Sequence, residues 1–361
     1  MQPQNYNVVG VMSGTSLDGI DLAHAILSFE EKTISFKLEN CETVPYPVDL
    51  LARLRDAVNL DDGRLAELDR DYTKHLGRVI SDFIFRHRLA PDAVCSHGHT
   101  VRHRPDLGYT LQIGNRAELF DFVGHTVVCD FRTADVKLGG QGAPLVPIGD
   151  RMLFPEFDYC LNLGGFSNIS CEADGKRIAF DISPVNTVLN HFANMLALDY
   201  DDRGEIASRG LINEMLLEKL DALGFYKVPY PKSLGAEFVR DQVLPLIAQF
   251  DIPIEDIMRT FTEHTVHQIA RFLDNRKGRM LVTGGGAYNE FLIKRLDNQL
   301  PEIEVVIPDK KIIEFKEALV FALLGVLKLR GEINVLSSVT GARHDHSSGV
   351  VYGDQTMSNV Q

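Results

Sequence analysis

The chain has 361 residues, of which 45% are hydrophobic, and it carries a formal net charge of −13. This length is sufficient for two domains with sizeable cores, and the acidic charge argues against nucleic acids and anionic membrane surfaces as partners. The longest apolar run, residues 318–327, falls far short of the ~20 residues that span a bilayer. The polar N-terminus does not fit a signal peptide. The five cysteines include no Cys-x-x-Cys pair, and we interpret them as reduced thiols of a cytoplasmic protein.

An apolar strand over residues 8–12 is expected to run into a turn of small residues at 13–19. A second apolar strand, 20–29, is expected to leave this turn. Gly14 and Gly19 permit backbone angles that other residues avoid, so backbone amides can converge on one point there. An ordinary hairpin turn would favour the same residue types, so the pattern alone does not distinguish a turn from a binding site.

The turn also carries hydroxyl groups and one carboxylate. The hydroxyls of Ser13, Thr15 and Ser16, together with converging amides, would form a nest for phosphate oxygens. A carboxylate that faces phosphates is repulsive unless a divalent cation lies between them. We therefore expect Asp18 to face either Mg²⁺ or the substrate.

The next segments predict an α/β domain. A third strand is expected over residues 34–43, and apolar residues at spacings of three and four predict a long helix over 65–83. A short buried strand, 92–96, is expected to end at His97 and His99. Ligands usually bind at strand ends of such a sheet, so both histidines are candidates for substrate contact. A metal site is the alternative, because the i, i+2 spacing could place both imidazoles on one side of a strand.

A strand over residues 126–132 is expected to end at Arg132, before a glycine-rich loop at 137–144 that contains Gln141. Three glycines in four positions suggest a segment near an interdomain cleft. Arg132 is either a solvated surface charge or a group that holds the substrate, because a guanidinium presents a planar fork of donors to sugar or carboxylate oxygens.

Residues 158–181 repeat the design of the first segment, with a strand at 159–163, a small-residue turn at 164–168 and a strand that leaves it. This repetition suggests two duplicated halves. Asp181 is expected at a strand end, followed by a helix with Ser183 as its cap and Pro184 at its first position. Asp181 is then either a catalytic carboxylate or only a charge that stabilises the helix start.

The last third of the chain provides another glycine turn. A helix over 254–272 is expected to lead into a strand at 280–283 and then into three glycines, a flat surface against which a nucleoside could pack. A final helix, 314–329, would place Glu317 on its first turn, where it either reaches the substrate or only complements the helix dipole. Residues 344–346, His-Asp-His, are expected to form a solvated loop.

The segment Gly10-Val-Met-Ser-Gly-Thr-Ser-Leu-Asp-Gly-Ile-Asp21 closely resembles the opening signature of the anhydro-N-acetylmuramic acid kinases. That family belongs to the sugar kinase, actin and heat-shock chaperone superfamily. The resemblance implies two ribonuclease-H-like domains, at 1–135 and 136–361, with a nucleotide and substrate cleft between them. The C-terminal segment could pack back on the first domain. Further matches follow in order along the chain, including Phe180-Asp181 with Pro184 and Asn186.

The resemblance implies that Asp181 is the catalytic base and that ATP and Mg²⁺ are the cofactors. It implies that the sugar contacts Asp18, His97, Arg132, Gln141 and Glu317, and that Asp18 meets the metal indirectly. The implied nucleotide contacts come from three glycine turns and their neighbours: Ser13, Gly14, Thr15, Ser16, Leu17, Asp18, Gly19, Ile20, Asn162, Gly164, Gly165, Gly284, Gly285, Gly286 and Asn289.

The implied activity is that of a phosphotransferase with an alcohol group as acceptor. Water would open the 1,6-anhydro ring of 1,6-anhydro-N-acetylmuramic acid while ATP phosphorylates the O6 thus freed, in the recycling of peptidoglycan. Two alternatives stay open at this point: a plain amino-sugar or hexose kinase, and an actin- or chaperone-like ATPase without a sugar substrate. A homodimer is also left open.

Overall fold

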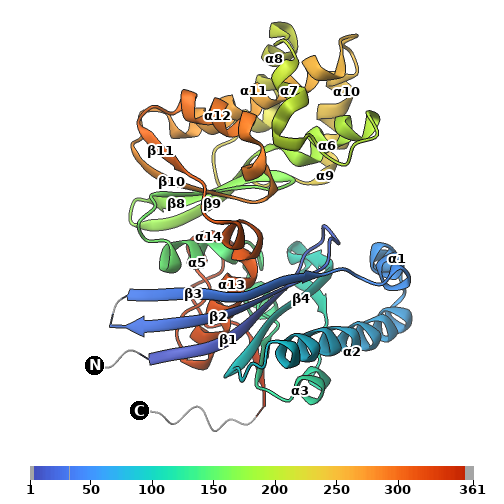
Figure 1. Cartoon of the computed structure of the whole chain (residues 1–361), viewed down its shortest axis with the longest axis vertical. Coiled ribbons are helices and arrows are strands. Elements are labelled where there is room, and N and C mark those ends of the chain that lie inside the picture. Colours follow the sequence, from blue (N-terminus) through green and yellow to red (C-terminus); the bar gives the residue numbers. More distant parts are fainter. Residues whose placement is uncertain (1–3, 32, 354–361) are drawn as a thin grey trace. The chain divides into compact units, whose positions relative to one another are not determined.

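The computed structural model describes residues 4–31 and 33–353. The chain divides into two compact units, residues 1–154 with 315–361, and residues 155–314 (Figure 1). The sequence had suggested a boundary after residue 135, whereas the structure assigns 136–154 to the first unit. This segment contains α5 (Val146–Leu153), which packs against β3, and the carboxylate of Asp150 accepts a hydrogen bond from Lys316 Nζ at 3.0 Å.

The first unit contains a seven-stranded sheet in the order β12-β6-β4-β1-β2-β3, with β5 also paired to β4. Strands β1, β2 and β3 form an antiparallel meander. Strand β4 runs parallel to β1, and β6 runs parallel to β4. The strands are β1 (Gln4–Ser13), β2 (Ile20–Glu30), β3 (Thr33–Val44), β4 (Ala93–Arg104), β5 (Tyr109–Ile113), β6 (Val127–Cys129) and β12 (Val350–Tyr352).

Both faces of this sheet are covered by helices. Val9 and Val11 of β1 pack into a core with α2 (Asp62–Arg86), whose apolar positions recur at the predicted helical spacing. Gly10, between them, faces α13 (Lys310–Leu329) so closely that a Cβ there would lie 1.9 Å from the carbonyl oxygen of Ala318. The remaining helices of the unit are α1 (Val48–Asp56), α3 (Glu118–Val123), α4 (Thr133–Lys137), α14 (Ser337–Thr340) and the 3₁₀ turns η1 (Ala57–Asn59) and η2 (Pro105–Leu107).

The second unit repeats this plan. Its five-stranded sheet has the order β11-β10-β7-β8-β9. Strands β7, β8 and β9 form an antiparallel meander, β10 runs parallel to β7, and β11 runs parallel to β10. This matches β6-β4-β1-β2-β3 of the first unit strand for strand, which confirms the duplicated α/β fold expected from the sequence. The strands are β7 (Tyr159–Leu163), β8 (Phe166–Ala173), β9 (Lys176–Pro184), β10 (Gly278–Thr283) and β11 (Ile303–Val306).

Helices of the second unit bury one apolar face of its sheet. The longest, α11 (Ile254–Leu273), was predicted from its spacing and carries Phe261 and Ile269 into the core. The others are α6 (Asn186–Met195), α7 (Glu205–Arg209), α8 (Glu214–Asp221), α9 (Ala236–Phe238), α10 (Leu244–Ile247) and α12 (Glu290–Gln299), with short turns η3 (Asp202–Gly204), η4 (Gly224–Lys227), η5 (Val239–Val243) and η6 (Gly285–Tyr288). Within the described residues, no helix has the length and apolar character needed to cross a membrane.

Two predicted helix starts are wrong. Strand β9 continues through Asp181 to Pro184, and α6 begins at Asn186 after Val185, so Ser183 is not a helix cap. Helix α13 begins at Lys310, where Asp309 caps it by accepting a hydrogen bond from the backbone N–H of Ile312 at 3.1 Å. Glu317 therefore lies about two turns into the helix and cannot complement its dipole from the first turn.

The C-terminal His-Asp-His segment is also more ordered than expected. His344 and Asp345 are exposed, but the side chain of His346 is only 8% exposed, with Nε2 3.6 Å from the carboxylate of Asp135. His346 pairs with Val335 through a backbone bridge. The segment is thus anchored to the first unit at one of its two histidines.

Candidate functional site

The first glycine turn is tied to the core by Ser13, the last residue of β1. The Ser13 hydroxyl is buried and lies 2.6 Å from the hydroxyls of both Tyr46 and Tyr72, and 3.4 Å from Nδ1 of His99. Its hydrogen-bonding capacity is therefore used to hold the base of the turn. Thr15, Ser16 and Asp18 are the exposed members of the turn and present their oxygens to solvent.

The conformation of this turn explains its glycines. The backbone N–H of Leu17 donates to the carbonyl of Gly14 at 3.3 Å, and Leu17 itself is left-handed with φ +63°. A Cβ at Gly19 would lie 2.8 Å from the carbonyl oxygen of Val44, so only glycine lets the chain pass back to Ile20 and strand β2. The predicted strand–turn–strand unit is confirmed.

His97 and Arg132 form a pair in the first unit. The Nε of Arg132 donates to Nε2 of His97 at 2.9 Å, and Nη1 donates to the carbonyl of Gly142 at 3.0 Å. Because a guanidinium only donates, Nε2 of His97 must be the unprotonated nitrogen, and Nδ1–H donates to the carbonyl of Gly98 at 2.8 Å. Burial, and then the charge of Arg132, lower the pKa of His97 well below its ordinary value. His97 is thus neutral and orients Arg132.

Glu317 is on the same side of α13 as this pair. Phe321, one turn further along α13, packs on the His97 ring with centroids 4.7 Å apart, so the shared helix face looks toward His97. Glu317 is exposed as a whole residue, but burial of its carboxyl raises the pKa of that group, an effect that Lys316 and Arg132 oppose. Burial lowers the pKa of Arg132 to about 10, and the negative charge of Glu317 opposes this shift. The structure therefore brings His97, Arg132 and Glu317 together.

Gln141 lies on the glycine-rich loop, which a buried carboxylate fixes. Asp135 is fully buried and accepts hydrogen bonds from the backbone N–H of Gly142 at 2.6 Å and from the Thr340 hydroxyl at 2.7 Å. The same loop supplies the carbonyl that holds Arg132. Sequence reasoning missed Asp135. Its signal was a charged residue amid apolar neighbours within a helix of five residues, which is weak.

The second and third glycine turns lie side by side in the second unit, because β10 pairs with β7 and places Thr283 opposite Asn162. The Asn162 side chain lies between the turns: a Cβ at Gly164 would lie 3.3 Å from its Nδ2, and one at Gly284 would lie 2.6 Å from its Oδ1. Gly165 and Gly285 are exposed at this edge. These turns present a bare backbone surface where two parallel strands end, the usual ligand position in such sheets.

Gly286 and Asn289, which belong to or follow the third glycine turn, make contacts within the second unit. Gly286 packs on Leu163, since a Cβ there would lie 2.7 Å from the Leu163 Cβ. Asn289, predicted as a nucleotide contact, is buried and caps α12, with Oδ1 accepting from the backbone N–H of Leu292 at 2.9 Å. Its other neighbour is Gly204, at which a Cβ would lie 2.1 Å from the same Oδ1.

Asp181 lies within β9, half-buried. Its Oδ2 accepts a hydrogen bond from the backbone N–H of Leu234 at 2.8 Å, and its own N–H donates to the carbonyl of Lys232 at 3.0 Å. Burial raises the pKa of the Asp181 carboxyl, and the Leu234 N–H partly offsets this. The segment 232–234 is in turn held by Lys232, whose Nζ lies 4.4 Å from the centre of the Phe225 ring. Sequence reasoning could not assign Lys232; here it packs on that ring.

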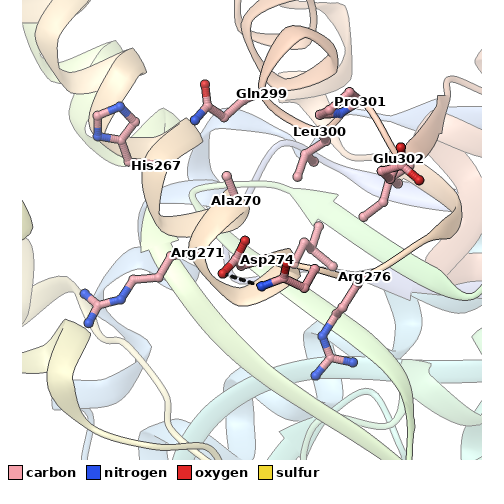
Figure 2. A pocket seen from close by; sticks show the side chains of 12 residues that line it. His267, Ala270, Arg271, Asp274, Arg276, Gln299, Leu300, Pro301 and Glu302 are labelled. Atoms are coloured by element: carbon pink, nitrogen blue, oxygen red, sulfur yellow. Dashed lines mark hydrogen bonds between the residues drawn. The ribbon is translucent and has the colours of Figure 1, made fainter.

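A pocket of about 640 Å³ lies elsewhere in the second unit (Figure 2). It is lined by the last turns of α11 and α12, including His267, Arg271 and Gln299, and by residues just before β10 and β11. These are the opposite strand ends from Gly284. The guanidinium carbon of Arg276 lies 4.8 Å from the centre of the Phe272 ring, so this charged residue of the pocket lining also packs within the protein. None of the predicted site residues lines this pocket.

Comparisons with known proteins find a family model and similar sequences for this chain. A family model described as "Anhydro-N-acetylmuramic acid kinase" matches residues 6–354. Proteins of that name from Pseudomonas fluorescens and Pseudomonas savastanoi pv. phaseolicola are 36% and 35% identical, each over 95% of this chain and 98% of the relative. Among solved structures, the activator of 2-hydroxyisocaproyl-CoA dehydratase from Clostridium difficile with bound ADPNP aligns with a TM-score of 0.43 at 13% identity, over 88% of this chain and 94% of that one.

Proposed function

Because this chain belongs to the anhydro-N-acetylmuramic acid kinase family, we propose that it opens 1,6-anhydro-N-acetylmuramic acid with water and phosphorylates O6 with ATP. The products are N-acetylmuramic acid 6-phosphate and ADP, and the reaction serves the recycling of cell-wall sugars in the cytoplasm. The observation that carries the hydrolytic part is Asp181, a half-buried carboxylate with a raised pKa and one oxygen held in place.

Asp181 suits the role of general base. A base works best when its pKa lies close to the working pH, and burial moves Asp181 in that direction. The Leu234 N–H fixes Oδ2, so Oδ1 is the oxygen that takes the proton. As Asp181 accepts that proton, the water oxygen bonds to C1, the C1–O6 bond breaks, and O6 takes the terminal phosphoryl group of ATP.

Both units carry groups that suit a ligand. The exposed glycine turns beside Asn162 suit the nucleotide, since bare backbone approaches a ligand closely. In the first unit, Arg132 is oriented by His97 and flanked by Glu317, which gives donors and an acceptor for a polar sugar. Gln141 is exposed on the loop that Asp135 fixes.

Mg²⁺ fits the first turn. Its exposed oxygens come from Thr15, Ser16 and Asp18, and hard cations prefer oxygen ligands and keep several waters. Among the described residues no three His, Cys, Asp or Glu side chains converge into a metal cage. The ion would therefore be held chiefly by ATP phosphates and water, with Asp18 beyond the first hydration layer. When bound, it would offset phosphate charge during transfer.

The function is tested with purified protein, ATP, Mg²⁺ and the anhydro-sugar. We expect ADP release that depends on the anhydro-sugar. In that sugar O6 is bonded to C1 on the β face, so direct displacement by water must yield the α-anomer of the 6-phosphate first. Proton NMR of the anomeric signal, recorded faster than mutarotation, reads this out. A plain kinase would prefer the ring-opened sugar and show no anomeric bias, while a β excess would rule out direct displacement.

Replacing Asp18 with Ala is expected to weaken productive use of MgATP, because the exposed turn loses its carboxylate. The measurement is turnover across an Mg²⁺ titration, in which the variant should need more Mg²⁺ than the wild type. Asp62→Ala, at an exposed carboxylate that pairs with Arg102 at the start of α2, is the matched control. Superimposable titrations of wild type and Asp18→Ala would remove Asp18 from the nucleotide site.

A further inference from the structure

Four polar residues lie in a row across the sheet of the second unit. Thr283 of β10 is paired with Asn162 of β7, which is paired with Asn168 of β8, which is paired with Asp181 of β9. Directly paired residues of neighbouring strands place their side chains on the same face. The neighbours along each strand belong to the apolar core on the other face: Leu161, Leu163, Ile169, Phe180 and Ile182.

The row connects the glycine turns with the base. Thr283 immediately precedes Gly284, and the Asn162 amide lies against Gly164 and Gly284. Since neighbouring strands are about 4.8 Å apart, the row is about 14 Å long. The hydroxyl of Thr283 is buried and has no hydrogen-bond partner among the described residues. Buried polar groups are nearly always paired, so this hydroxyl points to a ligand at that end of the row.

A β-bulge lies next to Asp181 at the other end. Ser167 pairs with Ser183 and Asn168 pairs with Asp181, so Ile182 is one extra residue on β9. Bulges of this kind re-aim side chains and are frequent beside active sites. The hydroxyl of Ser167 is already used, donating to the Ser183 carbonyl at 3.0 Å and accepting from its N–H at 3.1 Å. The amide of Asn168, which is half-buried, makes no side-chain hydrogen bond within the described part of the chain.

We propose that Asn168 and Asp181 together hold the water that attacks the sugar, an inference that rests on the proposed function. Directly opposed residues of antiparallel strands have Cβ atoms about 4.5–5.5 Å apart, which leaves room for one water between two side-chain oxygens. The water donates one hydrogen to Asp181 and the other to Oδ1 of Asn168. Its lone pair is then directed away from the sheet, toward C1.

The residue types support this division of roles. A second carboxylate at position 168 would repel the charge of Asp181 and raise its pKa further, so less of the base would be ionised. A neutral amide accepts the hydrogen bond without this effect. Asn162, which lies one strand further from Asp181 and against both glycine turns, is placed for the nucleotide phosphates instead.

The first test is Asn168→Ala. We expect kcat for the anhydro-sugar to fall roughly 10- to 100-fold, since a misplaced reactant costs up to about 10²-fold. KM for ATP and the melting temperature should stay within error of the wild type. Asn194→Ala, at an exposed asparagine on α6 of the same unit, is the matched control and should retain wild-type kcat.

The second test is Asn168→Asp, which keeps an acceptor and adds a charge. The acidic limb of its kcat/KM profile should move up by about one pH unit, and at high pH it should be faster than Asn168→Ala. An Asn168→Ala variant with kcat within twofold of the wild type, a loss confined to KM for ATP, or an unmoved limb in Asn168→Asp would each overturn this role. A wild type that releases no ADP with the anhydro-sugar would overturn the proposed function itself, which separates the two failures.

Discussion

Replacing Asp181 with Asn is expected to lower kcat by roughly 10²–10⁴-fold, the usual contribution of a general base. Asparagine keeps the shape of the side chain and an oxygen that can accept from the Leu234 N–H, but it cannot take a proton. Affinity for nucleotide and sugar should therefore be retained. The measurement is single-turnover phosphorylation, with binding of each substrate followed separately. A variant that keeps more than about a tenth of the wild-type rate would exclude Asp181 as the base.

The raised pKa of Asp181 adds a signature in pH. Activity should be lost as the pH falls through that pKa, which lies above the ordinary value of an aspartate, because the protonated form cannot act as a base. The effect on stability has the opposite sign. The native state binds a proton more tightly than the unfolded state, so the contribution of Asp181 to stability is present at low pH and lost as the pH rises through its native pKa.

This linkage separates a catalytic from a structural role. At pH 7 the ionised Asp181 destabilises the fold relative to a neutral side chain, so Asp181→Asn should melt at the same temperature as the wild type or higher. A lower melting temperature together with lost activity would mean that the carboxylate supports the fold and that the loss of turnover is indirect.

Replacing Gly284 with Ala is expected to weaken the binding of ATP strongly. Gly284 has φ +80° and ψ +167°, a backbone conformation that is essentially confined to glycine, and a Cβ there would lie 2.6 Å from Oδ1 of Asn162 and 2.9 Å from the Leu163 carbonyl. This conformation costs a residue with a Cβ roughly 1–3 kcal/mol, and overpacking adds about 1–3 kcal/mol. Either the turn moves or Asn162 is displaced, and both change the surface offered to the nucleotide. KM for ATP should rise at least tenfold, and the melting temperature should fall.

Gly175→Ala is the matched control. Gly175, in the hairpin between β8 and β9, has a similar φ of +75°, but a Cβ there would have no atom within 4 Å. It therefore measures the cost of a Cβ at a positive φ without a steric clash, and it should leave KM for ATP unchanged. If Gly284→Ala behaved like Gly175→Ala in both stability and KM, the third glycine turn would have no part in nucleotide binding.

Local patterns predicted the elements that local forces determine. The spacing of Leu65, Leu68 and Tyr72 predicted α2, and the strand–glycine–strand segments predicted the duplicated halves, because hydrophobic period and turn chemistry are properties of short stretches. The glycines of these turns are explained by close contacts, such as that between Gly19 and Val44.

Such local patterns do not predict contacts between segments that are distant in the sequence. Asp181 was expected at a helix start, but its N–H pairs with the carbonyl of Lys232, about 50 residues away, and the strand continues. The hydrogen bond from Arg132 to Nε2 of His97, by which His97 orients the guanidinium, joins residues 35 positions apart, and no local pattern displays it. The position of Asn168 opposite Asp181 depends on strand pairing and on a bulge, neither of which the sequence displays.

The division of the chain has a consequence for its synthesis on the ribosome. The first unit is made of residues 1–154 and 315–361, so the second unit is inserted within its sequence. Residues 155–314 are complete before the rest of α13, from Phe315 to Leu329, and β12 have been made, and domains generally fold as units during translation. The second unit can therefore fold first, while the N-terminal meander still lacks the helix against which Gly10 packs. The nascent chain thus exposes one apolar face of β1 and β2 until α13 has emerged.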